Sequence, residues 1–378
     1  MTQLSTQTKK HNKSKAAKAL KAVICIILAI AIAATAFIGI VTKKQADTAE
    51  NITYIGGMLK SDSIEYKSDS VGNLDKNPVM KLMEMIWYFC AKGDEKKHST
   101  QTPPEVEMRK DIPYIDDGNL YHKYDVFYPK NTASDAKLPV IIDIHGGGWM
   151  YATKDLNEYY CRALADRGFV VFSISYRLVP DVIVPEQLQD VMAALKSISE
   201  EMKNYPCDEN SIMLTGDSAG GMLAAYSSVL IQSAELRDVF ETVAVDMDID
   251  ALLLTSPVAY MKDGAISIYT KLLWGSDYKH KSTYNYMNFD EIIGYANALP
   301  PTYLITSSGD SLARKQTQKL AALLESKGVE TTLKDYPKYN GKSLAHVYSV
   351  LFPFDEAGSE MIDGAIEFYR NALSLIHI

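Results

Sequence analysis

Cysteine is scarce in this sequence, and the motifs of several protein classes are missing. The 378 residues hold four cysteines, Cys25, Cys90, Cys161 and Cys207, with no C-x-x-C pair and no metal-ligand cluster. A chain of this length with scattered cysteines is no disulfide-stapled miniprotein, and we expect isolated buried thiols. There is no internal repeat, no Walker lysine and no G-x-G-x-x-G, so nothing supports a nucleotide site.

Basic charge is also scarce outside the first segment. The formal net charge is -8, but residues 1–44 hold eight Lys and no acidic residue, which leaves -16 on the rest of the chain. A body this acidic is a poor match for nucleic-acid phosphates. Apolar residues make up 47% and charged residues 23%, which excludes wholesale disorder. The length suits one large α/β domain with additions, or two modest domains.

Residues 22–41 form one long uncharged and nearly wholly apolar run, AVICIILAIAIAATAFIGIV. A helix of this length spans a hydrocarbon core of about 30 Å. Six Lys precede it and two follow it, and the Lys-rich side of such a helix prefers the cytoplasm. We therefore expect a basic cytoplasmic tail over 1–21, a signal anchor over 22–41, a linker over 42–75 and an extracytoplasmic domain over 76–378. The alternatives are secretion after signal cleavage and a buried core helix.

From residue 106 onward, short apolar strands alternate with amphipathic helices. This alternation predicts an α/β fold with a mostly parallel central sheet flanked by helices on both faces. The expected strands cover 138–144, 169–175, 211–215, 251–256, 302–307 and 331–335, and the expected helices 155–167, 186–204, 313–327, about 356–375 and a stretch that begins at 219.

Two further segments fall outside this alternation. Val79–Ala91 has Met and aromatic residues at helical spacing, and a charged, proline-containing connector over 92–105 follows it. The long stretch from Val258 to Pro301 is Tyr-rich and irregular. The helical stripe suits either the core or a movable cover. We expect cap elements from about 76–105 and 258–300.

The strongest chemical signal is the segment GDSAGG, residues 216–221. It follows an apolar strand and precedes an Ala-rich helix, which is the strand–turn–helix setting of a nucleophile elbow. A serine on so tight a turn needs small neighbours, and Gly216 and Gly220 supply them. The turn also aims the amino terminus of the helix at the Ser218 oxygen, where partial positive charge favours a developing anion.

A second signal, HGGGW at residues 145–149, comes directly after the strand that ends at Ile144. Its glycines allow close approach of the backbone to a substrate and point amide N–H groups at one spot. Such donors stabilise the oxyanion of a tetrahedral intermediate more than they stabilise the ground-state carbonyl. The alternatives are an ordinary glycine-rich turn and a phosphate loop. His145 and Gly146 support the motif.

With HGGGW ahead of GDSAGG, the chain resembles the hormone-sensitive-lipase-like family of α/β-hydrolases. Residues 176–190 resemble the YRLAPE-type segment of that family, with Asp181 in the place of its usual Glu. The resemblance covers roughly residues 106–375 and implies the α/β-hydrolase fold. It also implies Ser218 as the nucleophile and an oxyanion hole made by the backbone N–H groups of Gly147, Gly148 and Ala219.

A serine nucleophile needs a general base, and in these folds the chain order is Ser, then Asp or Glu, then His. Three histidines follow Ser218. His346 lies between the last expected strand and the final helix, where this fold carries its base. His280 lies in the irregular insert, and His377 is the penultimate residue. We therefore expect His346 to be the base.

The acid is expected on the loop after the strand 302–307. Asp310 lies there, in a sequence that resembles the GxxDPL-type loop of the family with Ser311 in the place of proline. The alternatives are Asp263 and Asp277 after the previous strand, and Asp335 at the end of the next. Asp217, beside the nucleophile, is expected to be a local hydrogen-bonding residue.

These residues predict a serine hydrolase that cleaves carboxylic esters through an acyl-enzyme, with no metal or organic cofactor. The expected substrates carry short- to medium-chain acyl groups, or acetyl groups on an alcohol or sugar. The alternatives are an amidase or peptidase with the same triad and a catalytically weak binding or adhesion protein. The expected partners are the small-molecule ester and, through residues 22–41, a membrane. No oligomeric state and no nucleic acid partner is predicted.

Overall fold

The computed structural model describes residues 53–55, 58–60, 77–133 and 135–376. The predicted tail, the predicted membrane helix, most of the predicted linker and His377 lie outside the described residues. Among the helices that are described, none has the length and apolar character needed to cross a membrane. Two short strands, β1 (Thr53–Ile55) and β2 (Met58–Lys60), pair antiparallel with each other.

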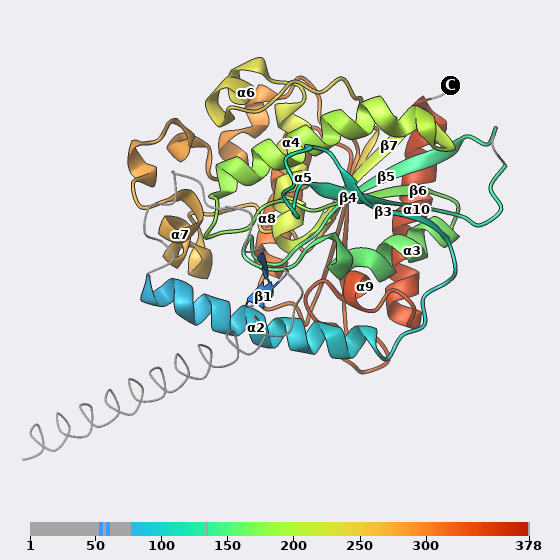
Figure 1. Ribbon diagram of the computed structural model, residues 1–378, viewed down its shortest axis with the longest axis horizontal. Coiled ribbons are helices and arrows are strands. Elements are labelled where there is room, and N and C mark those ends of the chain that lie inside the picture. The colour runs from blue at the N-terminus through green and yellow to red at the C-terminus, as the bar shows by residue number, and fades with distance from the viewer. Residues whose placement is uncertain (1–52, 56–57, 61–76, 134, 377–378) are drawn as a thin grey trace, which may run out of the picture.

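A mostly parallel sheet of eight strands forms the centre of the molecule (Figure 1). In order across the sheet the strands are β10 (Thr331–Tyr336), β9 (Thr302–Ser307), β8 (Ala251–Thr255), β7 (Cys207–Asp217), β5 (Leu138–Ile144), β6 (Val170–Ile174), β4 (Lys123–Tyr128) and β3 (Glu107–Pro113). Strand β4 runs antiparallel to both of its neighbours, and all other neighbouring pairs are parallel. The predicted α/β fold with a mostly parallel sheet flanked by helices is confirmed, although β3 and β4 were not among the expected strands.

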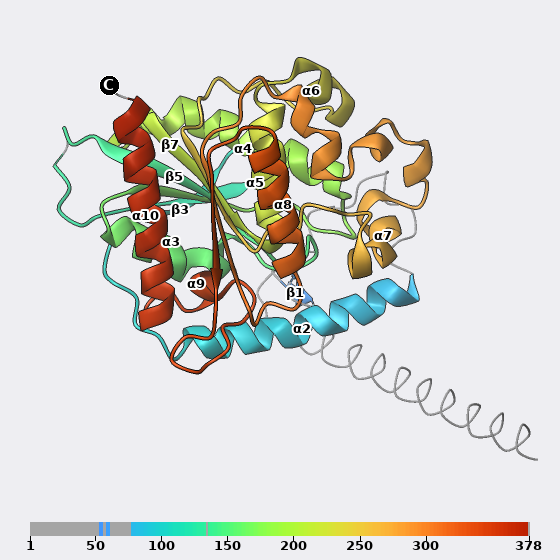
Figure 2. The same cartoon turned by 180° about the vertical axis from the view of Figure 1, so that it is seen from behind.

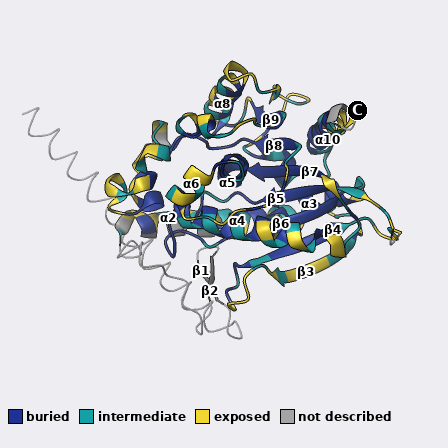
Figure 3. Ribbon diagram, turned by 90° about the horizontal axis from the view of Figure 1, so that it is seen from above, coloured by how far each residue is buried: buried dark blue, intermediate teal, exposed yellow. Residues whose placement is uncertain are grey.

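Side chains alternate between the two faces of the sheet, and each face has its own helices. In β5, Val140, Ile142 and Ile144 belong to one apolar cluster and Ile141 to the other. The first face is covered by α4 (Val184–Glu201), α5 (Ser218–Leu230), α6 (Ala234–Phe240) and α8 (Arg314–Ser326), and the second by α3 (Glu158–Asp166), α9 (Tyr348–Leu351) and α10 (Glu356–Ile376). Figure 2 shows α8 and α10 on opposite sides of the strands, and Figure 3 shows the central strands buried and β3 exposed at the edge.

Helix α2 (Pro78–His98) is longer than the sequence predicted. The Asn77 side chain accepts a hydrogen bond from the Val79 N–H and so caps the helix, and Pro78 occupies its first turn. Both features favour the start of a helix at this point. The expected end at Ala91 is wrong, because the next seven residues continue the helix. Those residues are polar, but Asp94 pairs with Lys97 one turn on, at 2.6 Å, and such pairs stabilise a helix.

The irregular segment from Val258 to Pro301, which we call the insert, lies between β8 and β9. It forms one short α-helix, α7 (Thr270–Trp274), and several single turns. These turns are the 3₁₀ helices η5 (Gly264–Ile268), η6 (Tyr278–His280), η7 (Ser282–Tyr286), η8 (Phe289–Glu291) and η9 (Ile293–Tyr295). Two other 3₁₀ turns, η3 (Lys154–Asn157) and η4 (Met202–Asn204), adjoin α3 and α4. Figures 1 and 2 both show α2 across one end of the molecule, with its first turns beside α7.

Candidate active site

Ser218 lies at a sharp turn between β7 and α5, as the motif predicted. It is the first residue of α5 and has a φ of +50°, a conformation that costs energy for a residue with a Cβ. The backbone is crowded here. A Cβ on Gly220 would lie 2.0 Å from the Ile144 carbonyl oxygen, and one on Gly216 would lie 2.5 Å from the Gly220 carbonyl oxygen. The two glycines are therefore required for the turn that presents the serine hydroxyl.

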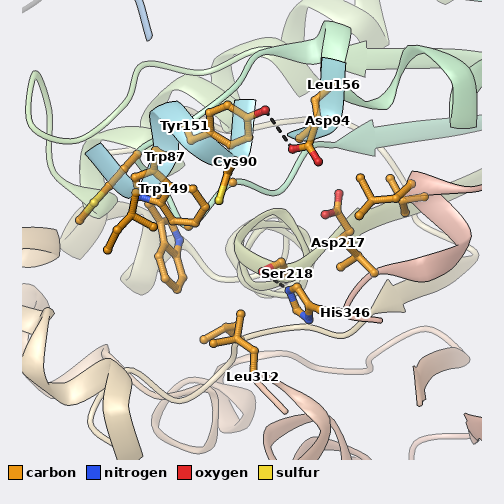
Figure 4. A pocket seen from close by; sticks show the side chains of 18 of the residues that line it. Trp87, Cys90, Asp94, Trp149, Tyr151, Leu156, Asp217, Ser218, Leu312 and His346 are labelled. Carbon is orange, nitrogen blue, oxygen red and sulfur yellow. Dashed lines mark hydrogen bonds between the residues drawn. The ribbon is translucent and has the colours of Figure 1, made fainter. Parts of the chain in front are cut away.

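Ser218, at the start of α5, meets His346 and Asp310, which lie in the loops after β10 and β9. Figure 4 shows the His346 ring beside Ser218. His346 Nε2 lies 2.9 Å from Ser218 Oγ, and His346 Nδ1 lies 3.0 Å from Asp310 Oδ2. Both distances are those of hydrogen bonds. The imidazole therefore bridges the hydroxyl and the carboxylate, which is the arrangement that allows a base to take the serine proton.

Asp310 is buried and lies on the loop after β9. Its Oδ1 accepts hydrogen bonds from the backbone N–H groups of Leu312 and Ala313, both at 2.9 Å. Burial alone would raise the pKa of Asp310. The hydrogen bond with His346 and the charge of His346 outweigh burial and lower the pKa to about 2. The carboxylate therefore stays ionised at neutral pH, and its second oxygen is left to orient the imidazole.

The glycine-rich loop 145–149 begins where β5 ends, and Ile144 pairs in register with Gly216 of β7. The loop and the serine turn are therefore neighbours at one edge of the sheet. Gly147 has a φ of +111° and Gly148 a φ of +59°, conformations that L side chains rarely adopt. A Cβ on Gly147 would also lie 2.2 Å from the Tyr151 carbonyl oxygen. Only glycine fits these two positions without rearrangement.

The side chain of His145 contacts Tyr176 and the backbone of its own loop. Its ring stacks on Tyr176, with centroids 4.4 Å apart, and its Nδ1 lies 2.7 Å from the Gly146 carbonyl oxygen. The Tyr176 hydroxyl donates to the His145 carbonyl at 2.8 Å. Burial lowers the pKa of His145 to about 4, so the ring is neutral at physiological pH. Its role is to hold the glycine loop in place.

Asp217, expected to be a local hydrogen-bonding residue, belongs to a buried polar network whose other members the sequence analysis did not name. Asp217 accepts hydrogen bonds at 2.9 Å from the Gly146 N–H and from the Asn157 side chain. The same Asn157 amide donates to Asp143 at 3.1 Å, and the Ser173 hydroxyl donates to Asp143 at 3.2 Å. Asn157 thus joins two buried carboxylates. Burial, together with the charge of Asp217, raises the pKa of Asp143 to about 7.

One signal of this network was present in the sequence. Asp143 and Ser173 each interrupt an otherwise apolar strand, and the structure places them opposite each other in the β5–β6 register. The position of Asn157 could not be read in the same way, because it lies on the 3₁₀ turn before α3.

The alternative candidates for the acid and the base that the structure describes are not in contact with Ser218. Each alternative acid forms an ion pair with a different residue. Asp335 pairs with Arg314 at 3.0 Å, Asp263 with Lys319 at 2.5 Å, and Asp277 with Lys281 at 3.8 Å. His280 ends the turn η6 in the insert. Within the described ranges, no group of three or more His, Cys, Asp and Glu side chains is placed to hold a metal ion, and Cys90, Cys161 and Cys207 are free thiols.

A cavity of about 590 Å³ opens over Ser218 and His346. Both segments expected to form a cap contribute to its wall. Side chains of α2 line one side and residues of the 258–301 insert line another, and the lining is mainly apolar; these residues include Met83, Ile86, Trp87, Cys90, Val258, Ile266, Tyr269 and Leu273. A largely apolar cavity with a few polar groups at one point is typical of a small-molecule site.

Helix α2 is attached to the glycine loop at this cavity. The Trp87 ring stacks on Tyr151, with centroids 5.6 Å apart and planes 4° from parallel. The Tyr151 hydroxyl donates to Asp94 at 3.0 Å. Trp87 also covers Gly148, since a Cβ there would lie 2.4 Å from the indole ring. One wall of the cavity is therefore fixed to the loop that faces Ser218.

The fold and this arrangement of side chains define an α/β-hydrolase with a Ser-His-Asp constellation. Residues 141–341 match the profile of a family described as having the alpha/beta hydrolase fold. The chain therefore belongs to the hormone-sensitive-lipase-like esterase family of α/β-hydrolases, and the resemblance noted in the sequence is confirmed.

Solved structures and curated relatives agree with this classification. Esterase B from Lactobacillus rhamnosis is 29% identical, with a TM-score of 0.73 over 79% of this chain and 96% of that chain. Its form inhibited by a tributyrin phosphonate is 30% identical, with a TM-score of 0.71 over 76% and 92%. Carboxylesterase NlhH from Mycobacterium tuberculosis is 27% identical over 294 residues, which are 71% of this chain and 88% of that protein.

A shorter match is found with neutral cholesterol ester hydrolase 1 from Pongo abelii. It is 41% identical over 104 residues, which are 26% of this chain and 26% of that protein. The chain thus spans about a quarter of the length of this relative.

Proposed function

We propose that this protein hydrolyses carboxylic esters with Ser218 as nucleophile, His346 as general base and Asp310 as the acid that orients the base. The observation that carries the proposal is the pair of contacts on His346, at 2.9 Å to Ser218 Oγ and 3.0 Å to Asp310 Oδ2. The nucleophile needs no metal or organic cofactor, because the neighbouring imidazole accepts its proton.

The reaction proceeds in two half-reactions. His346 Nε2 takes the Ser218 proton as Oγ attacks the ester carbonyl carbon, and a tetrahedral intermediate forms. As the ester C–O bond breaks, His346 returns the proton to the leaving alcohol and the acyl group remains on Ser218. A water molecule, deprotonated by His346 in the same way, then releases the carboxylic acid and restores the serine.

The negative charge of the intermediate needs donors that already point at it. The proposed donors are the backbone N–H groups of Gly147, Gly148 and Ala219. Two features support them: the loop and the serine turn are neighbours across the β5–β7 register, and Ala219 lies in the first turn of α5, where the helix dipole is positive. One such donor is typically worth about 3 kcal/mol in the transition state.

The cavity favours apolar acyl groups over acetylated sugars. Its wall is formed mainly by aliphatic and aromatic side chains of α2 and the insert, with Asp94 and Lys97 as polar members from α2. Such a wall matches hydrocarbon and offers few partners to sugar hydroxyls. We therefore propose short- to medium-chain acyl esters as substrates. The alternatives are an amidase or peptidase and a binding protein without turnover. No observation in the described part of the chain specifically supports either one.

The proposed location remains that of the sequence analysis. Residues 22–41 are proposed to anchor the chain in a membrane, with the catalytic domain on the extracytoplasmic side. The support is the twenty-residue uncharged run with eight flanking Lys. The mass of the mature protein tests this, since loss of about 40 residues would indicate a cleaved signal peptide instead.

A panel of p-nitrophenyl esters tests the function directly. We expect the parent protein to hydrolyse butyrate and hexanoate esters, and Ser218→Ala to lose turnover while it keeps its fold. Ser228→Ala is the matched control, because Ser228 is also buried in α5 but donates to the Ala225 carbonyl one turn away. Parent-level turnover by Ser218→Ala would refute the assignment. A preference for acetylated sugars over acyl esters would refute the substrate class.

A further inference from the structure

The mouth of the cavity carries exposed apolar side chains. The structure describes eight large hydrophobic residues as exposed, and all but Ile115 and Val243 lie on α2 or beside the cavity: Val79, Leu82, Ile86, Phe89, Ile268 and Leu312. Single exposed hydrophobics are normal on a protein surface, but a cluster of them marks an interaction site.

The cluster is continuous with the apolar wall of the cavity. Ile86 and Leu312 belong to both, because they line the cavity and are 41% and 53% exposed. Leu82 lies one helical turn before Ile86 on the same face of α2 and is 49% exposed. Ile268, in the insert across the mouth, is 72% exposed and lies next to the lining residue Tyr269. The apolar surface thus runs from the cavity out onto its rim.

The length and composition of the preceding chain bear on what this rim contacts. The apolar run ends at residue 41, and α2 begins at Pro78. A chain of 36 residues spans at most about 3.5 Å per residue, or roughly 125 Å, even when fully extended. If residues 22–41 are held in a membrane, α2 therefore stays within that distance of the bilayer surface and meets it at a raised effective concentration.

We propose that the rim formed by Leu82, Ile86, Ile268 and Leu312 docks on the lipid bilayer that holds residues 22–41, with the cavity mouth facing the lipid. This inference rests on the proposed anchor and names the source of substrate for the proposed esterase. Apolar side chains on one face of a surface helix enter the boundary between headgroups and acyl chains. The substrate class is then esters dissolved in the bilayer, which reach Ser218 from the lipid side.

Tryptophan substitutions test the position of the rim independently of catalysis. Leu82→Trp and Ile268→Trp are made in the full-length chain, with Val243→Trp as the matched control at an exposed apolar position away from the mouth. Each protein is reconstituted into phosphatidylcholine vesicles with and without bromine on the acyl chains, and the emission beyond that of the parent's three tryptophans is compared.

We expect the bromolipid to remove roughly half or more of the added emission of Leu82→Trp and Ile268→Trp and little of that of Val243→Trp, because the rim residues enter the acyl boundary. Equal quenching at all three positions, or none at the rim, would overturn the proposal. Rim tryptophans that are protected instead by concentration-dependent dimers, seen in light scattering, would also overturn it in favour of a second copy.

A charge substitution links docking to turnover. Leu82→Glu is expected to lower the hydrolysis of a vesicle-embedded ester by about tenfold, since the leucine side chain leaves the lipid. Hydrolysis of a water-soluble ester is expected to stay within about twofold of the parent, and Val243→Glu to change neither. An equal loss on both substrates, or no loss on either, would overturn docking. A parent without turnover on any ester would refute the proposed function and leave the quenching result to decide docking.

Discussion

Replacing Asp310 by Asn exchanges one acceptor oxygen beside His346 for a donor N–H₂ group, with almost no change in side-chain volume. In the parent, Asp310 Oδ1 accepts from two backbone N–H groups at 2.9 Å, and Oδ2 faces His346 Nδ1 at 3.0 Å. The same backbone donors hold the single oxygen of an introduced Asn, so the Asn N–H₂ group faces Nδ1. Nδ1 must then be the acceptor and Nε2 carries the proton, so Nε2 cannot take the proton of Ser218.

The expected loss follows from that wrong tautomer. Asp-to-Asn replacement in a serine triad lowers kcat by about 10⁴-fold, which corresponds to roughly 5.4 kcal/mol of transition-state stabilisation. The assay is kcat on p-nitrophenyl butyrate at neutral pH, with thermal denaturation to verify the fold. Asp335→Asn is the control, because that carboxylate pairs with Arg314 away from the site. A kcat for Asp310→Asn within about tenfold of the parent would refute the reasoning.

Three further substitutions test other parts of the site. Gly147→Ala puts a Cβ 2.2 Å from the Tyr151 carbonyl oxygen, so kcat should fall by about 10²-fold or more, and parent-level kcat would contradict the loop's role. Trp87→Ala widens the cavity, so the acyl-chain profile of kcat/KM should shift to longer chains; an unchanged profile would contradict its position in the wall. Burial raises the pKa of Asp143 from 3.8 to about 7, so the folded state favours the protonated carboxyl. The contribution of this group to the free energy of unfolding is therefore full below pH 3.8 and is lost as the pH rises through about 7. Urea denaturation of Asp143→Asn should therefore show its stability rising relative to the parent over that window, whereas a constant difference would contradict the burial argument.

Much of the site follows from the sequence because local motifs and strand order constrain it. Two glycine-rich segments each follow an apolar strand, and adjacent parallel strands bring their carboxyl ends to the same edge of the sheet. Asp310 and His346 lie in the loops after β9 and β10, and the chain order Ser, Asp, His, together with the resemblance of the Asp310 loop to that of the family, selected them. The elbow, the loop and the two partners of Ser218 therefore needed no knowledge of the packing.

The remainder depends on packing that sequence patterns do not contain. The second half of α2 is polar and lacks an apolar stripe, and it is helical partly because Asp94 reaches both Lys97 and Tyr151. Strand β3 lies at the sheet edge with mostly exposed polar side chains, so it shows no alternation that would predict a strand. Asn157 acquires its role only when β5 and β7 bring two carboxylates within reach of one amide.

The central claim is that His346 activates Ser218 for attack on an acyl carbon. The most direct measurement is to treat the full-length protein with a fluorophosphonate, which reacts with an activated serine hydroxyl, and to locate the adduct by peptide mass spectrometry. We expect one adduct, on the peptide that contains Ser218, and its loss in His346→Ala. An unlabelled protein, or an adduct on a different serine, would contradict the account.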